Sequence, residues 1–324
     1  MQRRESIDES RSQNAPVPAR QLLADLRTRP SAPRSGELIH FAGVGDRDVY
    51  NITAPFDLAG ETLIAGRVEA RDTELAETIF FAEGNDRVWR PRAGAPTFPK
   101  LQDPCIAFIQ GEFVIGGVEF PVELPGRDTP GWRMSFYRGK SLDTLRPFLQ
   151  GPDHMKDIRL VELADGRVGA CSRPQGERGG RGQIGFVAVD SLDQLTATAI
   201  DAAPLLTGQF LSDEWGGANE LHQLKDGRIG VLGHIAWMQG SGSTEEKHYY
   251  PMSFIMDPAT SEHTPLEIIA SRDDFPATTP KRPGLRDVIF SGGLVRDGDS
   301  TWLYAGLSDA TAGRVLIADP FGDG

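Results

Sequence analysis

The sequence predicts an all-β protein that forms a single five-bladed β-propeller with a central acidic funnel. Three observations favour this fold: short strand-like runs separated by turn residues, imperfect internal repeats, and acidic residues that recur beside the apolar runs. The chain has 324 residues, of which 39 % are hydrophobic and 25 % are charged. This length permits one large all-β domain or two ordinary domains, and either can bury a substantial core.

The strand-like runs begin at Gly36 and continue to the C-terminus; examples are residues 62–68, 77–81 and 111–118. Asp-Gly pairs at 165–166 and 226–227 lie between apolar runs, which is typical of β-hairpins. No helix-length apolar periodicity interrupts the runs. The chain after residue 36 is therefore predicted to consist of strands and turns.

Internal repeats indicate the architecture. Residues 163–169 (LADGRVG) recur 61 positions later as residues 224–230 (LKDGRIG). Phe136, followed by SLDTL, recurs 50 positions later as Phe186, followed by SLDQL. Imperfect repeats of this size in an all-β chain are typical of propeller blades. At roughly 50 to 60 residues per blade, residues 37–324 are predicted to form five blades in one catalytic domain.

Residues 1–36 are predicted to be a flexible extension, because they are polar and rich in Pro, Arg and Ser. One short amphipathic stretch, residues 20–27, is expected to form at most one or two helical turns. The first residues lack the apolar segment of a secretory signal. No run approaches the ~18 apolar residues of a membrane helix. We therefore expect a cytoplasmic protein that does not bind membranes.

Composition narrows the choice of ligands. The net charge of −12 argues against non-specific nucleic-acid binding, which requires a basic surface. Cys105 and Cys171 lie in apolar runs and are expected to be buried free thiols. The six His and two Cys show no metal-ligand spacing, so no metal site is predicted from them. The residues leave open whether a calcium ion occupies the acidic funnel.

Five acidic residues recur at or just before apolar runs, and they carry the site prediction: Glu69, Asp103, Asp157, Glu220 and Asp287. In a propeller the first strand of each blade lines the central channel, so these carboxylates are expected to converge on one site. The alternative is that each carboxylate caps a turn between strands. For a single residue the two interpretations are equally good, and the fivefold recurrence favours the funnel.

The segments that carry these residues resemble the domain-of-unknown-function family 1861. That family is grouped as glycosyltransferase family 108 and is related to the β-mannoside phosphorylases of glycoside hydrolase family 130. The matching segments are residues 48–56, 66–71, 101–104, 156–160, 215–220, 233–236 and 287–293. The resemblance implies a five-bladed propeller that acts on β-1,2-linked mannose.

What the resemblance implies is an inverting β-1,2-mannoside phosphorylase or mannosyltransferase. In one direction a mannoside and phosphate yield mannose 1-phosphate. In the other, mannose 1-phosphate or GDP-mannose is the donor to a mannose-containing oligosaccharide. Phosphate or mannose 1-phosphate would be a co-substrate, and no cofactor is required. Two alternatives stay open: a β-mannoside hydrolase on the same scaffold, and a non-catalytic carbohydrate-binding propeller.

The resemblance also implies a catalytic acid. Residues 101–104 (LQDP) match a Glu-Asp-Pro segment whose Asp is the acid in the related phosphorylases, so Asp103 is the candidate. An inverting phosphorolysis needs one protonated carboxyl, because phosphate itself attacks the opposite face of the sugar. This chain departs from the pattern on either side of the pair Asp103-Pro104, with Gln102 in place of Glu and Cys105 in place of a frequent Arg.

The phosphate pocket of the related phosphorylases uses Arg, Lys, His and Tyr, and the matching candidates here are Lys156, Arg173, His234 and one of Tyr249 or Tyr250. Two of these residues have a plainer interpretation. Lys156 could form a surface ion pair with the neighbouring Asp157. His234, which lies in an apolar run, could be an ordinary core residue. The candidate sugar-binding residues are Asp48, Asn51, Glu69, Asp157, Trp215, Asn219, Glu220 and Asp287, with Tyr50 as an alternative aromatic platform to Trp215.

Overall fold

The structure, a computed structural model, describes residues 15–29, 34–126 and 128–322, and most of its regular elements are β-strands. This confirms the prediction of a β-rich fold, whereas the number of blades stays a prediction. Among the described residues the helices are short: α1 (Ala19–Thr28), α2 (Ala197–Asp201) and the 3-10 helices η2 (Leu142–Thr144), η3 (Leu192–Gln194), η4 (Gly242–Thr244), η5 (Arg272–Asp274) and η6 (Pro283–Leu285).

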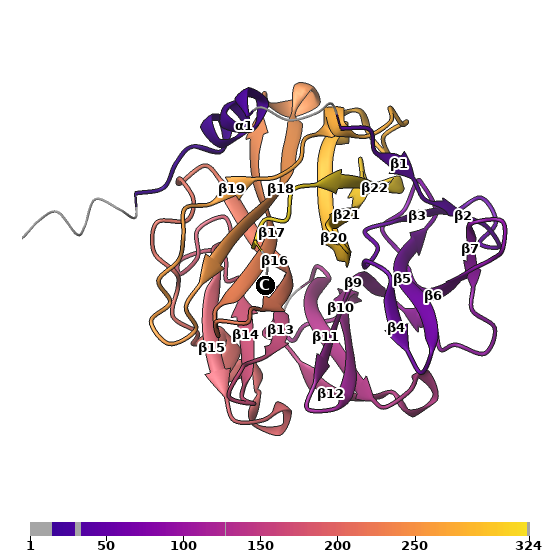
Figure 1. The fold of residues 1–324 in the computed structure, drawn as a ribbon, viewed down its shortest axis with the longest axis horizontal. Coiled ribbons are helices and arrows are strands. Elements are labelled where there is room, and N and C mark those ends of the chain that lie inside the picture. Colours follow the sequence, from indigo (N-terminus) through magenta and orange to yellow (C-terminus); the bar gives the residue numbers. More distant parts are fainter. Residues whose placement is uncertain (1–14, 30–33, 127, 323–324) are drawn as a thin grey trace, which may run out of the picture.

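The strands form four sheets, which follow one another around the centre of the molecule in sequence order (Figure 1). The seven-stranded sheet contains β2 (His40–Phe41), β3 (Asp48–Tyr50), β4 (Phe56–Leu58), β5 (Glu61–Glu69), β6 (Glu77–Glu83), β7 (Val88–Pro91) and β8 (Phe98–Pro99). The four-stranded sheet contains β9 (Leu101–Ile109), β10 (Glu112–Val122), β11 (Gly131–Gly139) and β12 (Arg146–Gln150). The three-stranded sheet contains β13 (Arg159–Glu162), β14 (Val168–Ser172) and β15 (Gly185–Val189).

The eight-stranded sheet contains two antiparallel units joined by a parallel contact between β18 and β20. Its strands are β16 (Trp215–Gln223), β17 (Ile229–Gln239), β18 (Glu246–Met256), β19 (Glu267–Ile268), β20 (Asp287–Asp297), β21 (Ser300–Leu307), β22 (Thr311–Ile317) and β1 (Glu37–Leu38). The segment that contains β1 and β2 links the last sheet to the first, because β1 pairs with β22 and β2 pairs with β7.

The repeats in the sequence correspond to equivalent turns. Gly166 and Gly227 adopt left-handed φ values of 82° and 88° in the hairpins β13–β14 and β16–β17, and Asp-Gly supplies that conformation. The Ser-Leu-Asp segments form η2 after β11 and η3 after β15. Phe136 and Phe186 are both buried in the strands that precede these turns.

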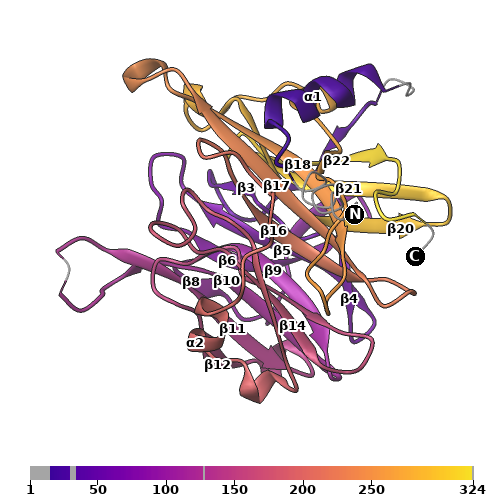
Figure 2. The same ribbon diagram turned by 90° about the vertical axis from the view of Figure 1, so that its left-hand side faces the viewer.

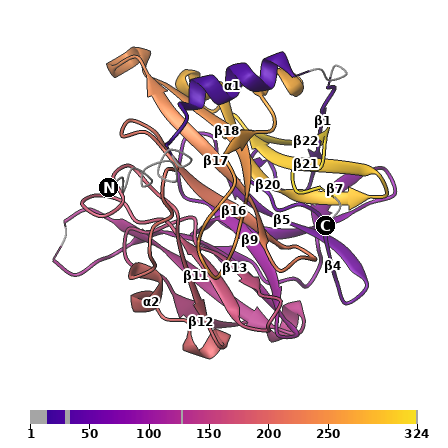
Figure 3. The same cartoon turned by 60° about the vertical axis from the view of Figure 1, so that its left-hand side comes forward.

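Helix α1 lies within the segment that the sequence suggested to be flexible, and it is longer than the expected one or two turns. Ala19, Leu22, Leu23 and Leu26 lie on one face and are buried in the largest apolar cluster. The first turn is also tied down, because the backbone N–H of Ala19 donates to a carboxylate oxygen of Glu214 over 2.7 Å. Figure 3 shows the helix along one edge of the molecule, where it contacts β17 and β19.

No helix among the described residues is long and apolar enough to cross a membrane.

Candidate active site

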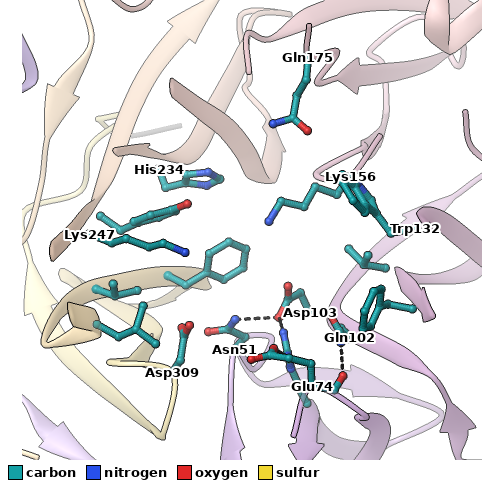
Figure 4. Close-up of a pocket in the computed structure, with 17 residues that line it drawn as sticks. Asn51, Glu74, Gln102, Asp103, Trp132, Lys156, Gln175, His234, Lys247 and Asp309 are labelled. Carbon is teal, nitrogen blue, oxygen red and sulfur yellow. Dashed lines mark hydrogen bonds and ion pairs between the residues drawn. The ribbon is translucent and has the colours of Figure 1, made fainter. Parts of the chain in front are cut away.

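A cavity of about 450 Å³ lies where residues from different sheets meet. Its position depends on the whole arrangement of sheets, since β5, β9, β10, β11, β17, β18 and β20 all contribute to its wall. The lining residues are Asn51, Arg67, Glu74, Gln102, Asp103, Val118, Phe120, Trp132, Lys156, Gln175, His234, Lys247, Tyr249, Leu285, Val288, Phe290 and Asp309 (Figure 4).

Asp103 points into this cavity from β9. Its Oδ1 accepts hydrogen bonds from Asn51 Nδ2 over 2.7 Å and from Arg67 Nη1 over 3.1 Å. In Figure 4 the other carboxylate oxygen is directed toward the open part of the cavity. The two donors therefore fix the orientation of the carboxyl group and leave Oδ2 for a ligand.

Irregular backbone occurs at several polar residues in the cavity wall and directly behind it. The register of β9 against β10 shifts next to Asp103, and that of β16 against β17 shifts at Asn219. Bulges of this kind re-aim a side chain and are common next to active sites. Asp103, Asn51, Asp157 and Asp309 also adopt left-handed φ values between 43° and 59°. Asn and Asp tolerate this conformation better than other non-glycine residues.

A buried ionic network lies behind Asp103. Arg67 donates to Glu69 Oε2 through Nε (3.1 Å) and Nη2 (2.8 Å), and through Nη2 also to Glu74 (3.0 Å). Lys281 contacts both Glu69 and Glu74 through its Nζ. Tyr50 donates its hydroxyl to Glu69 as well. Glu69, a predicted sugar ligand, is thus buried behind the cavity wall and fully engaged there.

Lys156 and Lys247 approach the cavity from two sides, and Figure 4 shows both amines directed toward its centre. Among the residues that the structure describes, no carboxylate lies within 4.0 Å of either Nζ. The ion pair considered for Lys156 and Asp157 is therefore not formed. Instead, Asp157 has Arg173 Nε at 3.4 Å and Arg159 Nη2 at 3.9 Å.

His234 forms part of the wall beside the lysines. Its Nδ1 lies 2.8 Å from Asn219 Oδ1, and its ring stacks on that of Tyr249 with a centroid separation of 5.5 Å. Burial lowers the pKa of His234 to about 3, so the imidazole is neutral near pH 7. A neutral imidazole offers a hydrogen bond without adding charge.

Arg173 and Asp157 are buried side by side behind His234 and do not line the cavity. Arg173 Nε also donates to the carbonyl of Gly216 over 2.6 Å. Burial raises the pKa of Asp157. The positive charges around it, chiefly those of Arg173 and Lys156, have the larger combined effect and hold the pKa at about 2. The structure therefore places Arg173 next to Asp157 behind the cavity wall and not among the residues that line the cavity.

The remaining predicted residues lie outside the cavity. Trp215 is buried and donates its Nε1 to the hydroxyl of Tyr249 over 2.9 Å. Tyr250 donates its hydroxyl to Asp287. Asp48 pairs with Arg71 in a partly exposed ion pair.

Glu220 lies elsewhere, in a second cavity of about 840 Å³, where it accepts a hydrogen bond from the N–H of Leu294 over 2.9 Å. Of the five acidic residues expected to converge, only Asp103 lines the 450 Å³ cavity. The structure thus differs from that expectation. Buried cations neutralise Glu69 and Asp157, and neighbouring backbone or side-chain groups engage Glu220 and Asp287.

Sequence reasoning missed several residues that line the cavity: Arg67, Glu74, Trp132, Gln175, Lys247 and Asp309. The sequence could have indicated Arg67, because it lies two positions before Glu69 in a strand and therefore on the same face. No sequence pattern indicates Asp309, because it lies in the turn after β21. Burial raises the pKa of Asp309, and Asp103 adds to the shift through its negative charge.

No cluster of three or more His, Cys, Asp or Glu suited to a metal ion occurs among the described residues.

A family model described as "Protein of unknown function (DUF1861)" matches residues 27–323. The chain belongs to the DUF1861 family. No curated protein matches this DUF1861 protein.

Solved structures resemble it along nearly the whole chain. A mannose phosphorylase from Leishmania mexicana, MPT-4 in complex with a phosphate ion, is 34 % identical over 93 % of each chain, with a TM-score of 0.84. MPT-1, a GDP-Man-dependent mannosyltransferase from the same organism, is 31 % identical over 94 % of this chain and 95 % of its own, also with a TM-score of 0.84. A β-1,2-mannobiose phosphorylase from Listeria innocua shares the fold at 13 % identity and a TM-score of 0.58, over 90 % of this chain and 93 % of its own.

Proposed function

We propose that this DUF1861 protein is an inverting β-1,2-mannoside phosphorylase or mannosyltransferase. In this proposal it makes or breaks β-1,2-mannose linkages with phosphate and mannose 1-phosphate, or with GDP-mannose as donor, and needs no other cofactor. We further propose that the antiparallel units β3–β7, β9–β12, β13–β15, β16–β18 and β20–β22 are five blades of one propeller.

The observation that carries the proposal is the opposition of one carboxyl group and several phosphate-binding groups across a single cavity. Asp103 occupies one side, and Lys247, His234 and Tyr249 line another, with Lys156 directed between them (Figure 4). Ammonium groups bind phosphate oxygens through charge-assisted hydrogen bonds. The neutral imidazole of His234 donates from Nδ1 to Asn219 Oδ1, so its Nε2 can accept a hydrogen bond from a protonated phosphate oxygen. The 34 % identity to a mannose phosphorylase with bound phosphate supports the same assignment.

The proposed chemistry follows from this geometry. Phosphate held by Lys156, Lys247 and His234 attacks C1 of the mannosyl group, and the C1–O bond to the leaving sugar breaks. Asp103 gives its proton to the leaving oxygen, directly or through a sugar hydroxyl. Because Asn51 and Arg67 both donate to Oδ1, Oδ2 is the oxygen left to carry the proton that is transferred. Attack from the opposite face converts the β-linkage into an α-phosphate ester.

Hydrolysis on the same scaffold would be favoured if the predicted cations did not converge near Asp103. Lys156 and His234 do line the same cavity as Asp103, and Lys247 joins them. Arg173 lies behind this wall, where it supports Asp157. The two ammonium groups of Lys156 and Lys247 therefore favour phosphate over water as the nucleophile.

An assay with three arms tests the proposal. Purified protein is incubated with mannose 1-phosphate and mannose, with GDP-mannose and mannose, and with β-1,2-mannobiose and phosphate. We expect a new oligosaccharide with release of phosphate or nucleotide, or mannose 1-phosphate in the third arm, and loss of turnover in Asp103→Asn. Free mannose from mannobiose without phosphate would favour the hydrolase. Turnover in no arm with folded protein would refute the mannoside assignment.

A further inference from the structure

Apolar side chains line the cavity on more than one side, with Phe290 against His234 (ring centroids 5.4 Å apart) and a second group on the β9–β12 sheet. In this second group, Val118, Phe120 and Trp132 line the cavity from β10 and β11, and none of these side chains carries a charge. Figure 4 shows Trp132 on the side of the cavity away from His234 and Lys247. We call these three residues the apolar wall.

The apolar wall belongs to the same sheet as the candidate acid. Asp103 lies in β9, and β9 pairs with β10, which pairs with β11. Lys247, the neutral His234 and Tyr249 come from β17 and β18 in a different sheet. In an inverting transfer, the acid acts on the side of the leaving sugar, and the nucleophile approaches from the opposite face. The leaving sugar is therefore expected on the side of the β9–β12 sheet.

The ring of Trp132 is held in place before any ligand binds. His154 packs against it edge to face, with ring centroids 4.8 Å apart and an interplanar angle of 86°. The backbone N–H of His154 also donates to the carbonyl of Trp132 over 2.7 Å. A fixed aromatic surface loses little conformational entropy when a ligand binds to it.

Gln102 adds a polar group beside the apolar wall. Its Nε2 donates to the carbonyl of Glu74 over 2.6 Å, so its amide orientation is set. The carbonyl end of the amide is then the end that can accept a hydrogen bond from a sugar hydroxyl. A pyranose has this dual character, with an apolar C–H face and polar hydroxyl edges.

The cavity lies between two hairpins that project from the same side of the molecule. Figure 2 shows the hairpins β10–β11 and β17–β18 extending beyond the sheets on that side. Trp132 lies near the end of the first hairpin, and Lys247 lies near the end of the second. Each hairpin therefore contributes a side chain near its end to the lining of the cavity.

We propose that Val118, Phe120 and Trp132, with Gln102, form the acceptor subsite of the cavity, and that Trp132 stacks on the apolar face of a mannosyl unit of an oligosaccharide. This proposal rests on the proposed function, because it assigns the sugar that leaves in phosphorolysis and accepts in synthesis. Trp132 contacts this sugar and determines acceptor affinity, whereas phosphate binding depends on Lys247 and His234 across the cavity and on Lys156, whose amine reaches the centre from the side of Trp132.

The experiment compares the wild type with Trp132→Ala, Trp132→Leu, Trp132→Phe and the control Phe108→Ala. Phe108 is an aromatic residue with 51 % exposure that lines the 840 Å³ cavity instead. With mannose 1-phosphate as donor, we expect Trp132→Ala to raise the KM for β-1,2-mannobiose as acceptor about five- to tenfold. The KM for mannose 1-phosphate stays unchanged. Trp132→Phe retains most of the acceptor affinity, and Phe108→Ala behaves as the wild type.

Trp132→Leu keeps an apolar side chain but removes the flat ring that would stack on the sugar. It therefore replaces Trp132→Ala in the test if the alanine variant does not fold. Wild-type kinetics in folded Trp132→Leu or Trp132→Ala would overturn the acceptor subsite while leaving the proposed function intact. If the wild type turns over nothing, the proposed function fails, and calorimetric titration with β-1,2-mannobiose still tests the subsite. Weaker binding by the Trp132 variants than by the wild type supports it. Equal binding, or no binding by any protein, refutes it.

Discussion

Arg67 donates a hydrogen bond from Nη1 to Oδ1 of Asp103 over 3.1 Å, across 36 positions of the sequence and between two sheets. Its remaining nitrogens are occupied by Glu69 and Glu74. The planar guanidinium thus joins the buried carboxylates of one sheet to the candidate acid of the next. Since each nitrogen has a fixed direction, the position of Asp103 depends on the whole network behind it.

We expect Arg67→Lys to lower kcat about ten- to hundredfold in phosphorolysis of β-1,2-mannobiose, since hydrogen bonds to charged groups contribute roughly 1.5–3 kcal/mol. Lysine keeps the charge but cannot reach Asp103, Glu69 and Glu74 at once. Steady-state kinetics with a thermal melt as the folding check would measure this. An unchanged kcat in folded Arg67→Lys would show that Arg67 does not position the acid.

Lys281→Met is expected to lower the free energy of unfolding by about 3–5 kcal/mol, because it leaves the buried carboxylate of Glu69 without one of its cations. Urea unfolding gives the value. The matched control is Arg282→Met, because Arg282 pairs with Glu74 at 3.0 Å but has a side chain that is 61 % exposed. We expect less than about 1 kcal/mol for the control. The double variant Lys281→Met/Glu69→Gln should recover stability, and no recovery would contradict this account.

His234 predicts a pH dependence of stability. Its pKa is about 3 in the folded protein and 6.5 when unperturbed, so the unfolded chain binds a proton in this window that the folded chain does not. Stability therefore rises with pH between these values and is lost as the pH falls through them. The slope approaches about 1.4 kcal/mol per pH unit. The pKa of Asp157 is about 2 in the folded protein and 3.8 when unperturbed. Protonation of Asp157 therefore also lowers the stability as the pH falls, but only below about pH 4.

Urea unfolding at several pH values between 4.5 and 6.5 would measure this slope. His234→Gln should flatten it, whereas His40→Gln, at an exposed position, should leave it as in the wild type. The same slope in His234→Gln and wild type would assign the pH dependence to another group.

Lys247→Met should raise the KM for phosphate about ten- to hundredfold and leave the KM for mannobiose nearly unchanged. Lys247 lines the cavity and has no carboxylate partner among the residues described, so its charge is available to an anionic ligand. Initial rates at varied phosphate measure the effect, and Lys225→Met, at the 840 Å³ cavity, is the control. An increase confined to the sugar KM would place phosphate elsewhere.

Gly306→Ala should displace Asn51 from Asp103, because a Cβ at position 306 would lie 2.1 Å from Asn51 Oδ1 and 2.6 Å from its backbone N. We expect a loss of about 1–3 kcal/mol in stability and a reduced kcat. Gly227→Ala is the control. Its Cβ would meet no atom within 4 Å, so only backbone strain of about 1 kcal/mol is expected, with normal kinetics. Normal kinetics in Gly306→Ala would mean that Asn51 is not needed.

Local sequence patterns predicted the local parts of the structure well. The Asp-Gly pairs formed the expected hairpins, and Asp103, Asn51, Lys156, His234 and Tyr249 line one cavity as a group. These residues lie in segments whose order resembles the family pattern. The amphipathic stretch near the N-terminus was underestimated, because its stability comes from burial against distant strands rather than from helix propensity.

Contacts between distant segments could not be predicted. Lys281 reaches Glu69 across 212 positions, and no periodicity within either segment indicates that the two side chains meet. The acidic residues at the starts of apolar runs looked alike in sequence, yet Glu69 and Asp157 are neutralised by buried cations and Asp103 faces the cavity. That difference depends on which neighbouring sheet supplies an arginine or lysine.

The left-handed backbone of Asn51, Asp103, Asp157 and Asp309 makes alanine scanning a poor probe of this site. Alanine at such a φ adds backbone strain to the loss of the polar group, so it would overstate the role of each side chain. Glycine removes the group and suits the conformation. A natural relative with glycine at position 103 would therefore keep the scaffold and lose the acid, which is a short evolutionary route from an enzyme to a carbohydrate receptor.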